Sequence, residues 1–210
     1  MKLIRQRTIW WPTWQGWVLL FLLAVGSLAL LIANLHDFLA VTERVADADS
    51  LAVEAWVPEK VARVAAEEFK NNGYRSFLVT GFNDTRDHAR MSAAVQRLVS
   101  YGIPRDRVIV CTGSPVDEYR SFTMARALRD AVKQGTVITR GVNIVAPAAH
   151  ARKTWLAYSR ALGAEISVGI IAVLPGDYEP KRWWQSSQGV KWVVANGAGW
   201  LHELITGPRL

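Results

Sequence analysis

The chain has 210 residues, half of them hydrophobic, which is enough for one ordinary domain and an additional segment. Its single cysteine, Cys111, excludes an intrachain disulfide and argues against a thiolate metal cluster. The formal net charge of +7 favours an anionic partner such as phosphate, nucleic acid or lipid headgroups, unless it only reflects a solvated surface rich in arginine.

The first element that the sequence predicts is a membrane helix. Between Trp14 and Leu35 no residue is charged, and this stretch reaches the length of about 20 residues that a helix needs to cross a bilayer. A cleaved signal peptide is the alternative, with small residues for cleavage at 45–50, but its apolar core is usually shorter, so we expect an uncleaved anchor. Four tryptophans cluster at the N-terminal end of this stretch, namely Trp10, Trp11, Trp14 and Trp17. Indole rings favour the level of the lipid headgroups, so this cluster fits a membrane interface.

The charges on either side of this helix predict its orientation. Lys2, Arg5 and Arg7 precede it, whereas residues 36–50 carry one basic and four acidic residues. The positive-inside rule then places the N-terminus in the cytoplasm and the remainder outside it. We therefore predict a single-pass protein of the inner (cytoplasmic) membrane, in contact with the bilayer, with a cytoplasmic N-terminus at 1–13, a transmembrane helix at 14–35, a stalk at 36–50 and an extracytoplasmic domain at 51–210.

Beyond the stalk, apolar runs alternate with amphipathic stretches. The runs predict strands at 51–57, 76–80, 107–111, 142–146 and 166–174. Helical spacing predicts helices at 59–72, 87–101, 117–133, 149–162 and about 187–205. Apolar strands separated by single helices indicate a mainly parallel sheet covered on both faces, an α/β, Rossmann-like three-layer sandwich. The last helix is expected to bury Val190, Val194, Gly197, Leu201 and Leu204.

In such a sheet ligands bind beyond the carboxyl ends of the strands, so the loops there hold the candidate site residues. After the second strand, Thr80, Gly81 and Asn83 offer hydroxyl, amide and backbone N–H groups to an anion, next to a helix N-terminus. The glycine spacing matches neither a P-loop nor the dinucleotide fingerprint. The same loop also fits an ordinary helix cap, formed by Asp84, Thr85 or Asp87.

Two arginines and a histidine follow the third and fourth strands. Arg120 lies in the first turns of a helix, where the dipole disfavours a cation, so we expect it to contact Glu118 or to bind a phosphate. His150 lies near the next helix N-terminus, which favours a neutral imidazole that can act as a base or hydrogen-bond a phosphoryl oxygen. Arg152 offers a planar fork for phosphate or carboxylate. An ordinary surface position is the alternative for His150 and Arg152.

Glu54 is the only charged residue in the first predicted strand, where a carboxylate is costly unless it is paired. It is expected to pair with Arg120 or Arg152, or to act as a general base with a raised pKa. A metal site through Glu54, Asp84 and His150 has no supporting ligand spacing, and the sequence leaves the cofactor unknown.

Trp183 and Trp184 precede the last helix. Paired tryptophans can stack on a sugar or base, lie at a membrane interface or cover the sheet. We expect one of the two to cover the sheet and the other to line a cleft, with Trp183 as the candidate ligand contact.

Several stretches resemble the YdcF/ElyC/SanA family of bacterial envelope proteins. They are VEAWVPEKVARVAAEEF, VTGF, YGIPRDRVIV, YRSFTMARAL, NIVAPAAHARKTWLAYSRALG and YEPKRWWQSSQGVKW, which run from about residue 51 to 205. The resemblance implies a Rossmann-like fold, one N-terminal membrane helix and an association with cell-envelope integrity. It also implies that five of the candidates are motif positions, namely Thr80, Gly81, Arg120, His150 and Arg152.

The chain departs from the family at three places. The glycine-rich turn that many members carry after the first strand is EAWVPE here, and the second motif ends in Gly81–Phe82 instead of Gly-Gly. Asn196 stands where the last helix often carries a glutamate. These differences weaken any role that needs a phosphate-wrapping loop after the first strand.

Two functions are expected from these residues. The first is an enzyme that acts on a phosphorylated or lipid-linked envelope precursor of peptidoglycan or polysaccharide, with Arg120 and Arg152 holding the anion and His150 or Glu54 moving the proton. The second is a non-catalytic binding or assembly factor that uses the same pocket. Nucleic acid is not expected as a partner, because the domain is predicted to lie outside the cytoplasm.

Overall fold

The computed structural model describes residues 11–208, apart from the side chain of Arg86, and consists of two compact units. The first unit reaches Asn34 and the second begins at Leu35, so helix α1 (Trp14–Leu39) contributes its last residues to the second unit. Most of the predicted cytoplasmic N-terminus lies outside the described residues, including Lys2, Arg5, Arg7 and Trp10.

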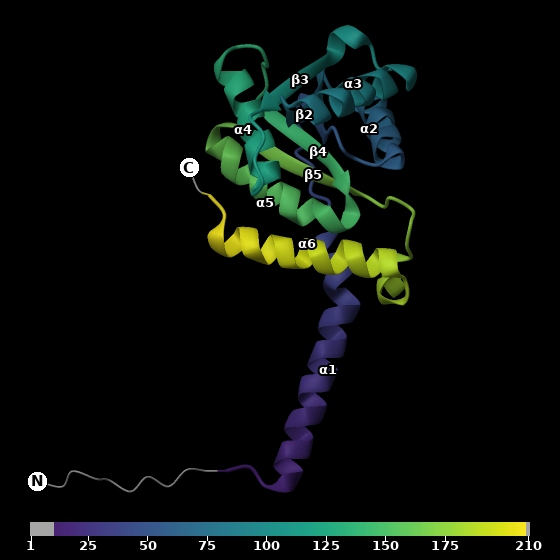
Figure 1. The fold of residues 1–210 in the computed structure, drawn as a ribbon, viewed down its shortest axis with the longest axis vertical. Coiled ribbons are helices and arrows are strands. Elements are labelled where there is room, and N and C mark those ends of the chain that lie inside the picture. Colours follow the sequence, from purple (N-terminus) through teal and green to yellow (C-terminus); the bar gives the residue numbers. More distant parts are fainter. Residues whose placement is uncertain (1–10, 209–210) are drawn as a thin grey trace, which may run out of the picture. The chain divides into compact units, whose positions relative to one another are not determined.

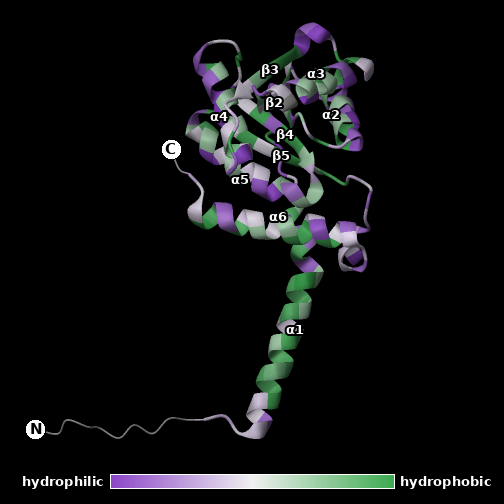
Figure 2. Cartoon of the chain, viewed as in Figure 1, coloured by the Kyte–Doolittle hydropathy of each residue, from purple (hydrophilic) through white to green (hydrophobic). Residues whose placement is uncertain are grey.

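Helix α1 is 26 residues long, and it carries no ionisable side chain before His36. Figure 2 shows it coloured as hydrophobic along most of its length. By length and composition it is able to cross a membrane, a test that an N-terminal signal sequence also passes. The predicted helix at 14–35 is confirmed and continues for four further residues.

The second unit is built on a five-stranded sheet in which every strand pairing is parallel. Its strands are β1 (Ser50–Glu54), β2 (Ser76–Phe82), β3 (Val108–Gly113), β4 (Gly141–Pro147) and β5 (Ser167–Val173). They lie in the order β3-β2-β1-β4-β5. The chain thus builds outward from β1 to β3, then crosses back to β4 on the other side of β1, as in a doubly wound fold.

Helices cover both faces of this sheet (Figure 1). On one face lie α2 (Glu59–Asn71) and α3 (Thr85–Ser100), and on the other lie α4 (Arg120–Lys133) and α5 (Ala151–Leu162). Short 3-10 helices lie between the main elements, at η1 (Arg105–Arg107), η2 (Ala148–His150), η3 (Gly163–Glu165) and η4 (Pro180–Gln185). The α/β three-layer fold is confirmed.

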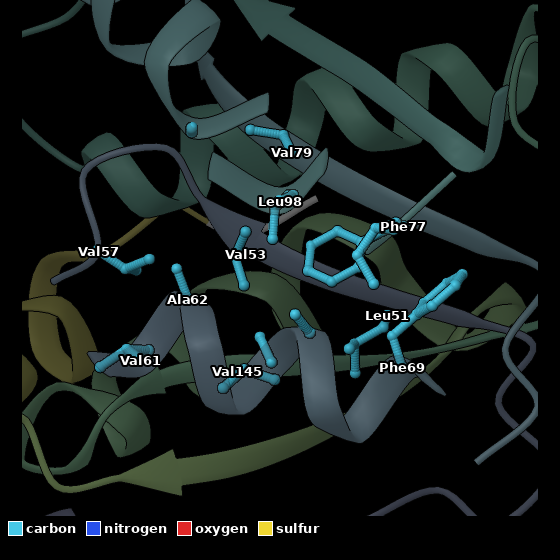
Figure 3. Close-up of a cluster of buried hydrophobic side chains, with 14 of the residues drawn as sticks. Leu51, Val53, Val57, Val61, Ala62, Phe69, Phe77, Val79, Leu98 and Val145 are labelled. Atoms are coloured by element: carbon cyan, nitrogen blue, oxygen red, sulfur yellow. The ribbon is translucent and has the colours of Figure 1, made fainter. Parts of the chain in front are cut away.

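Alternate residues of the central strand face opposite cores. Leu51 and Val53 of β1 join Phe77 of β2 and Phe69 of α2 in the core under α2 and α3, which Figure 3 shows. Ala52, between them, belongs to the second core, under α4 and α5. Full burial of a large apolar side chain contributes about 1.5–3 kcal/mol, so two-sided burial explains why these strands are apolar throughout.

The segment predicted as a stalk is held along the sheet. Glu43 and Ile170 of β5 exchange two backbone hydrogen bonds of 2.8 Å. The side-chain amide of Asn143 on β4 accepts from the Val45 N–H at 2.9 Å and donates to the Val45 carbonyl at 3.0 Å. Gly169 makes this approach possible, because a Cβ there would lie 1.9 Å from the Asn143 amide oxygen. These residues are therefore part of the folded domain.

From β1 onward, two element boundaries differ from the sequence prediction by three residues, more than the others do. The first strand ends at Glu54 instead of residue 57, because the Val57 N–H turns back to the Glu54 carbonyl at 3.1 Å. Helix α4 begins at Arg120 instead of residue 117, since Tyr119 before it has a left-handed backbone with φ of 50°.

The predicted inward face of the last helix is wrong. Helix α6 (Ser187–Thr206) leaves four of the five residues expected to be buried exposed to solvent, namely Val190, Val194, Leu201 and Leu204. Gly189, Val193 and Glu203 are the buried residues, with Asn196 and Trp200 half-buried on the same face. Because that inward stripe contains a glycine, an asparagine and a glutamate, hydropathy alone assigns the wrong side of the helix.

Candidate functional site

The carboxyl ends of β1 and β4 mark the topological switch point of the sheet. Helical connections leave these neighbouring strands in opposite directions, which opens a crevice where ligands bind in open α/β sheets. Glu54 is the last residue of β1, and His150 is the last residue of η2, which follows β4 directly. Two of the sequence-predicted candidates are therefore brought together at this point.

Glu54 and His150 form a buried pair. The Glu54 Oε2 atom lies 3.9 Å from Nε2 of His150, and the two residues are 2 % and 8 % exposed. Oε1 of Glu54 and Nε2 of His150 are buried without a hydrogen-bond partner among the described residues. Buried polar atoms are rarely left unsatisfied, so two such atoms side by side indicate a place for a donor supplied by a ligand, water or a shared proton.

Asn196 on α6 fixes the orientation of the imidazole. Its Nδ2 donates to the Trp192 carbonyl at 2.7 Å, which leaves the amide oxygen facing Nδ1 of His150 at 2.6 Å. Since the amide oxygen only accepts, the ring carries its proton on Nδ1. The lone pair on Nε2 of the neutral ring therefore faces Glu54.

Burial lowers the pKa of His150 from its ordinary value of 6.5. The Glu54 carboxylate and the Asn196 hydrogen bond act in the opposite direction, and Lys153 adds a smaller lowering effect. A neutral imidazole with a free Nε2 is the form that accepts a proton, so the ring is suited to serve as a general base. The sequence also predicted a neutral His150, which agrees with this lowered pKa.

Trp56 connects this pair to the surface. Its indole N–H donates to Oε2 of Glu54 at 2.5 Å, and its ring meets the His150 ring edge-on at 5.2 Å between centroids. Trp192 stacks beside it at 6.4 Å. Trp56 also lines a hollow of about 510 Å³, together with Ala55, Val57, Arg90, Ala93 and Arg97. Trp56 thus links the buried pair to a hollow that carries two guanidinium groups.

These contacts differ from the pairing predicted for Glu54. Instead of Arg120 or Arg152, its carboxylate contacts Trp56 and faces His150. The arginines that line the neighbouring hollow are Arg90 and Arg97 of α3, which the sequence did not single out. Their spacing of seven residues places them on one helix face, but an exposed helix commonly carries such a pair, so the signal was weak.

Thr80 and Gly81 have structural roles in β2. The Thr80 hydroxyl lies 2.7 Å from the Tyr158 hydroxyl and donates to the Val53 carbonyl at 3.3 Å, fully buried. A Cβ on Gly81 would lie 2.5 Å from Sδ of Met91, so glycine allows α3 to pack closely on the strand. Both residues hold the helices around the site in place, and their predicted ligand contacts stay a prediction.

Asn83 and Arg120 lie beside other hollows. Asn83 lines one of about 550 Å³ between β3 and α4. Arg120 lines one of about 500 Å³, and its guanidinium lies 4.5 Å above the Phe82 ring and 3.6 Å from the Asp87 carboxylate. The carboxylate that Arg120 contacts is therefore that of Asp87, whereas the sequence analysis considered Glu118. Asp84 caps α3 by accepting from the Asp87 N–H at 2.7 Å, which confirms the cap considered for this loop.

Arg152 and Trp183 pack against other parts of the domain. Arg152 donates to the Phe38 carbonyl, and its guanidinium lies 4.1 Å above the Phe38 ring, so it holds the last turn of α1. Trp183 is buried, whereas its neighbour Trp184 is 42 % exposed. Of the two, Trp184 is therefore the side chain free to meet a ligand or a surface. The predicted ligand contacts of Arg152 and Trp183 stay untested.

The fold and the site define an α/β protein with a buried acid–base pair at its switch point. Within residues 11–208, no group of three or more histidine, cysteine, aspartate or glutamate side chains is arranged to hold a metal ion. Neither the known family models nor the curated proteins contain a match to this chain.

Proposed function

We propose that this is a membrane-anchored envelope protein whose α/β domain binds or acts on a phosphorylated or lipid-linked precursor of peptidoglycan or polysaccharide. The observation that carries the proposal is the pair of unpartnered buried atoms, Glu54 Oε1 and His150 Nε2, at the switch point. A substrate hydroxyl placed there would donate to Nε2 of His150 and pass its proton to that nitrogen, and the Glu54 carboxylate would stabilise the imidazolium that forms.

The charge beside the pair supports an anionic ligand. Arg90 and Arg97 line the hollow next to Trp56, and planar guanidinium groups bind phosphate oxygens in pairs. Arg90 also contacts the Asp87 carboxylate at 2.9 Å, which holds its side chain over the hollow. We assign the anion to this pair, ahead of Arg120 and Arg152, because Arg90 and Arg97 line the hollow that Trp56 also lines, and the other two do not.

The location is part of the same proposal. Basic residues precede α1 and acidic residues follow it, which favours a domain outside the cytoplasm, next to lipid-linked precursors. The resemblance to the YdcF/ElyC/SanA family points to the same compartment, and Asn196, one of the departures from that family, is the residue that contacts His150. A single-pass inner-membrane protein with its N-terminus in the cytoplasm fits both the charges around α1 and the resemblance.

A binding or assembly factor is the second candidate. Its support is that Trp56, which lines the hollow, is held by its stacking on Trp192 and its hydrogen bond to Glu54, and a rigid aromatic wall serves recognition as well as catalysis. Turnover of the bound compound separates the two candidates.

The test uses the full chain in nanodiscs with polyprenyl phosphate and polyprenyl diphosphate as probes. Native mass spectrometry measures the bound probe, and release of inorganic phosphate measures turnover. We expect His150→Ala and Arg97→Ala each to weaken binding about tenfold or more, since each removes a charged or buried hydrogen-bonding group. Binding without phosphate release would favour the assembly factor.

Arg140→Ala is the matched control, because Arg140 is exposed and precedes β4, at the opposite edge of the sheet. It removes the same charge and is expected to bind the probes as the wild type does. Equal binding by wild type, His150→Ala and Arg97→Ala would overturn the proposal, as would an equal loss in Arg140→Ala, which would indicate non-specific attraction.

A further inference from the structure

Helix α6 exposes a continuous apolar stripe. Val190, Val194, Leu201 and Ile205 are 39 %, 50 %, 50 % and 70 % exposed. Their spacing of four, seven and four residues keeps them on one face of the helix. Four large aliphatic side chains aligned in this way differ from the scattered exposed residues of an ordinary soluble surface.

The opposite face of α6 is firmly packed, so the stripe is not the result of a loose helix. Val193 and Glu203 are buried on the inward side. Arg160 of α5 donates to the carbonyls of Glu203 and Leu204 at 2.5 and 3.1 Å. The helix therefore has a fixed rotation, and its apolar stripe is held facing away from the domain.

The exposed charged residues of η4 and α6 are basic, and the nearest exposed acidic residues are Asp177 and Glu179 before η4, of which Asp177 accepts from Gln188 and Trp192 of α6. Lys181 and Arg182 in η4 and Lys191 in α6 are exposed, and Trp184 is exposed beside them. From residue 180 to residue 206 the only acidic side chain is that of Glu203, which is buried. An apolar stripe with basic and tryptophan neighbours is the pattern of helices that lie in the headgroup region of an anionic bilayer.

The end of the predicted membrane helix packs against the middle of α6, next to the exposed stripe. The Phe38 ring meets the Trp200 ring edge-on at 4.9 Å between centroids. A Cβ on Gly197 would lie 3.7 Å from both Leu35 and Leu39. These contacts fall within the second unit, and Leu35 is only two residues beyond Ala33 in the apolar run. The end of the run is thus tied by the chain itself to α6.

From these observations we propose that the exposed face of α6 lies on the lipid surface of the membrane that α1 enters. Its aliphatic stripe would insert below the headgroups, while Lys181, Arg182 and Lys191 meet anionic lipid. This docking requires α1 as a membrane helix but no ligand at Glu54 and His150, so it goes beyond the proposed function and fails independently of it.

The docking has a consequence for the site. Asn196 and Trp192, which contact His150 and Trp56, belong to the same helix whose other face meets the lipid. The crevice at the switch point is then held near the headgroup level, where the phosphate of a membrane lipid lies. A shift of α6 on the bilayer would also move the residue that orients the imidazole.

The test places spin labels on the full chain in nanodiscs of phosphatidylcholine and phosphatidylglycerol, with one protein copy in each disc. Single cysteines replace Val194 and Leu201 on the stripe, and Cys111 stays because it is buried and burial raises its pKa to about 11. We expect both labels to collide several-fold more often with oxygen, which enters lipid, than with a water-soluble nickel complex.

Two exposed positions off the stripe serve as matched controls, Ala195 on α6 and Ile138 in the loop before β4. Their labels are expected to meet the nickel complex more often. Labels at Val194 and Leu201 that are as water-accessible as those at Ala195 and Ile138 would overturn the proposal. So would protection that is seen in discs with two copies and absent from single-copy discs, since it would identify a second copy of the chain as the occupant.

A second variant tests the charge separately from the stripe. Lys181→Glu, Arg182→Glu and Lys191→Glu, combined, should reduce the oxygen preference of the Leu201 label in anionic discs and leave it unchanged in discs of phosphatidylcholine alone. A reduction of the same size in both lipids would contradict the role assigned to the basic residues.

Discussion

Nδ1 of His150 lies 2.6 Å from the amide oxygen of Asn196, so a residue 46 positions later in the sequence determines which ring nitrogen carries the proton. The Trp192 carbonyl holds that amide in turn. The free Nε2 then faces Glu54 from 3.9 Å. The acid–base pair at the switch point thus depends on α6 as much as on the strands that carry it.

Asn196→Asp should raise the pKa of His150. The carboxylate would accept from Nδ1–H as the amide does, and its negative charge would stabilise the imidazolium, opposing the effect of burial. The pKa can be followed through the ring resonances of selectively labelled histidine. Asn196→Leu is the contrasting variant and should lower the pKa further, because it removes a hydrogen bond that raises it. Equal pKa values in the two variants would refute the tautomer assignment.

The buried imidazole should also make stability depend on pH. The folded pKa of His150 lies below the unfolded value of about 6.5, so the unfolded chain binds a proton first as pH falls. The free energy of unfolding is therefore expected to decrease below about pH 6.5, despite the opposing attraction of Glu54. His150→Gln should weaken this decrease, measured as the melting temperature between pH 7 and pH 5. Exposed His88 provides the control, His88→Gln, with an expected dependence like that of the wild type.

The fold was readable from the sequence because its signals are local. Apolar runs such as VNIVA and helical spacings such as that of Val61, Ala65 and Phe69 depend on neighbours within a few residues. The parallel sheet follows from their alternation. The rotation of α6 did not follow, since its buried side includes Glu203 and its exposed side includes Leu201.

The site was only half predictable. Glu54 and His150 were found because strand ends in an α/β sheet are known positions for ligands. Trp56 and Arg97 were not singled out, and Asn196 was noted only as a departure from the family, since no spacing links residue 54 with residues 150 and 196. Arg152 was expected to face a ligand because it follows His150 closely, but on a helix residues two apart point in different directions, and its guanidinium lies over Phe38.

Tyr158→Phe should destabilise the domain without changing its surface. The Tyr158 hydroxyl donates to Thr80, which donates to the Val53 carbonyl, and all of these groups are buried. Loss of one buried hydrogen bond costs about 1–2 kcal/mol, to be measured by chemical denaturation. Thr80→Val in the Tyr158→Phe background should cost less than in the wild type. Strict additivity would show that the two hydroxyls do not act together.

Gly81→Ala tests whether the glycine serves packing or a ligand. Its new Cβ would lie 2.5 Å from Sδ and 2.9 Å from Cγ of Met91, the flexible end of a side chain on α3. Overpacking of this kind costs about 1–3 kcal/mol, and the value should lie at the low end because methionine adapts. In a Met91→Ala background the same change should cost little, because the clashing atoms are gone. A double-mutant cycle by denaturation measures this coupling. A cost for Gly81→Ala that is independent of Met91 would contradict the packing role and return the glycine to the candidates for backbone contact with a ligand.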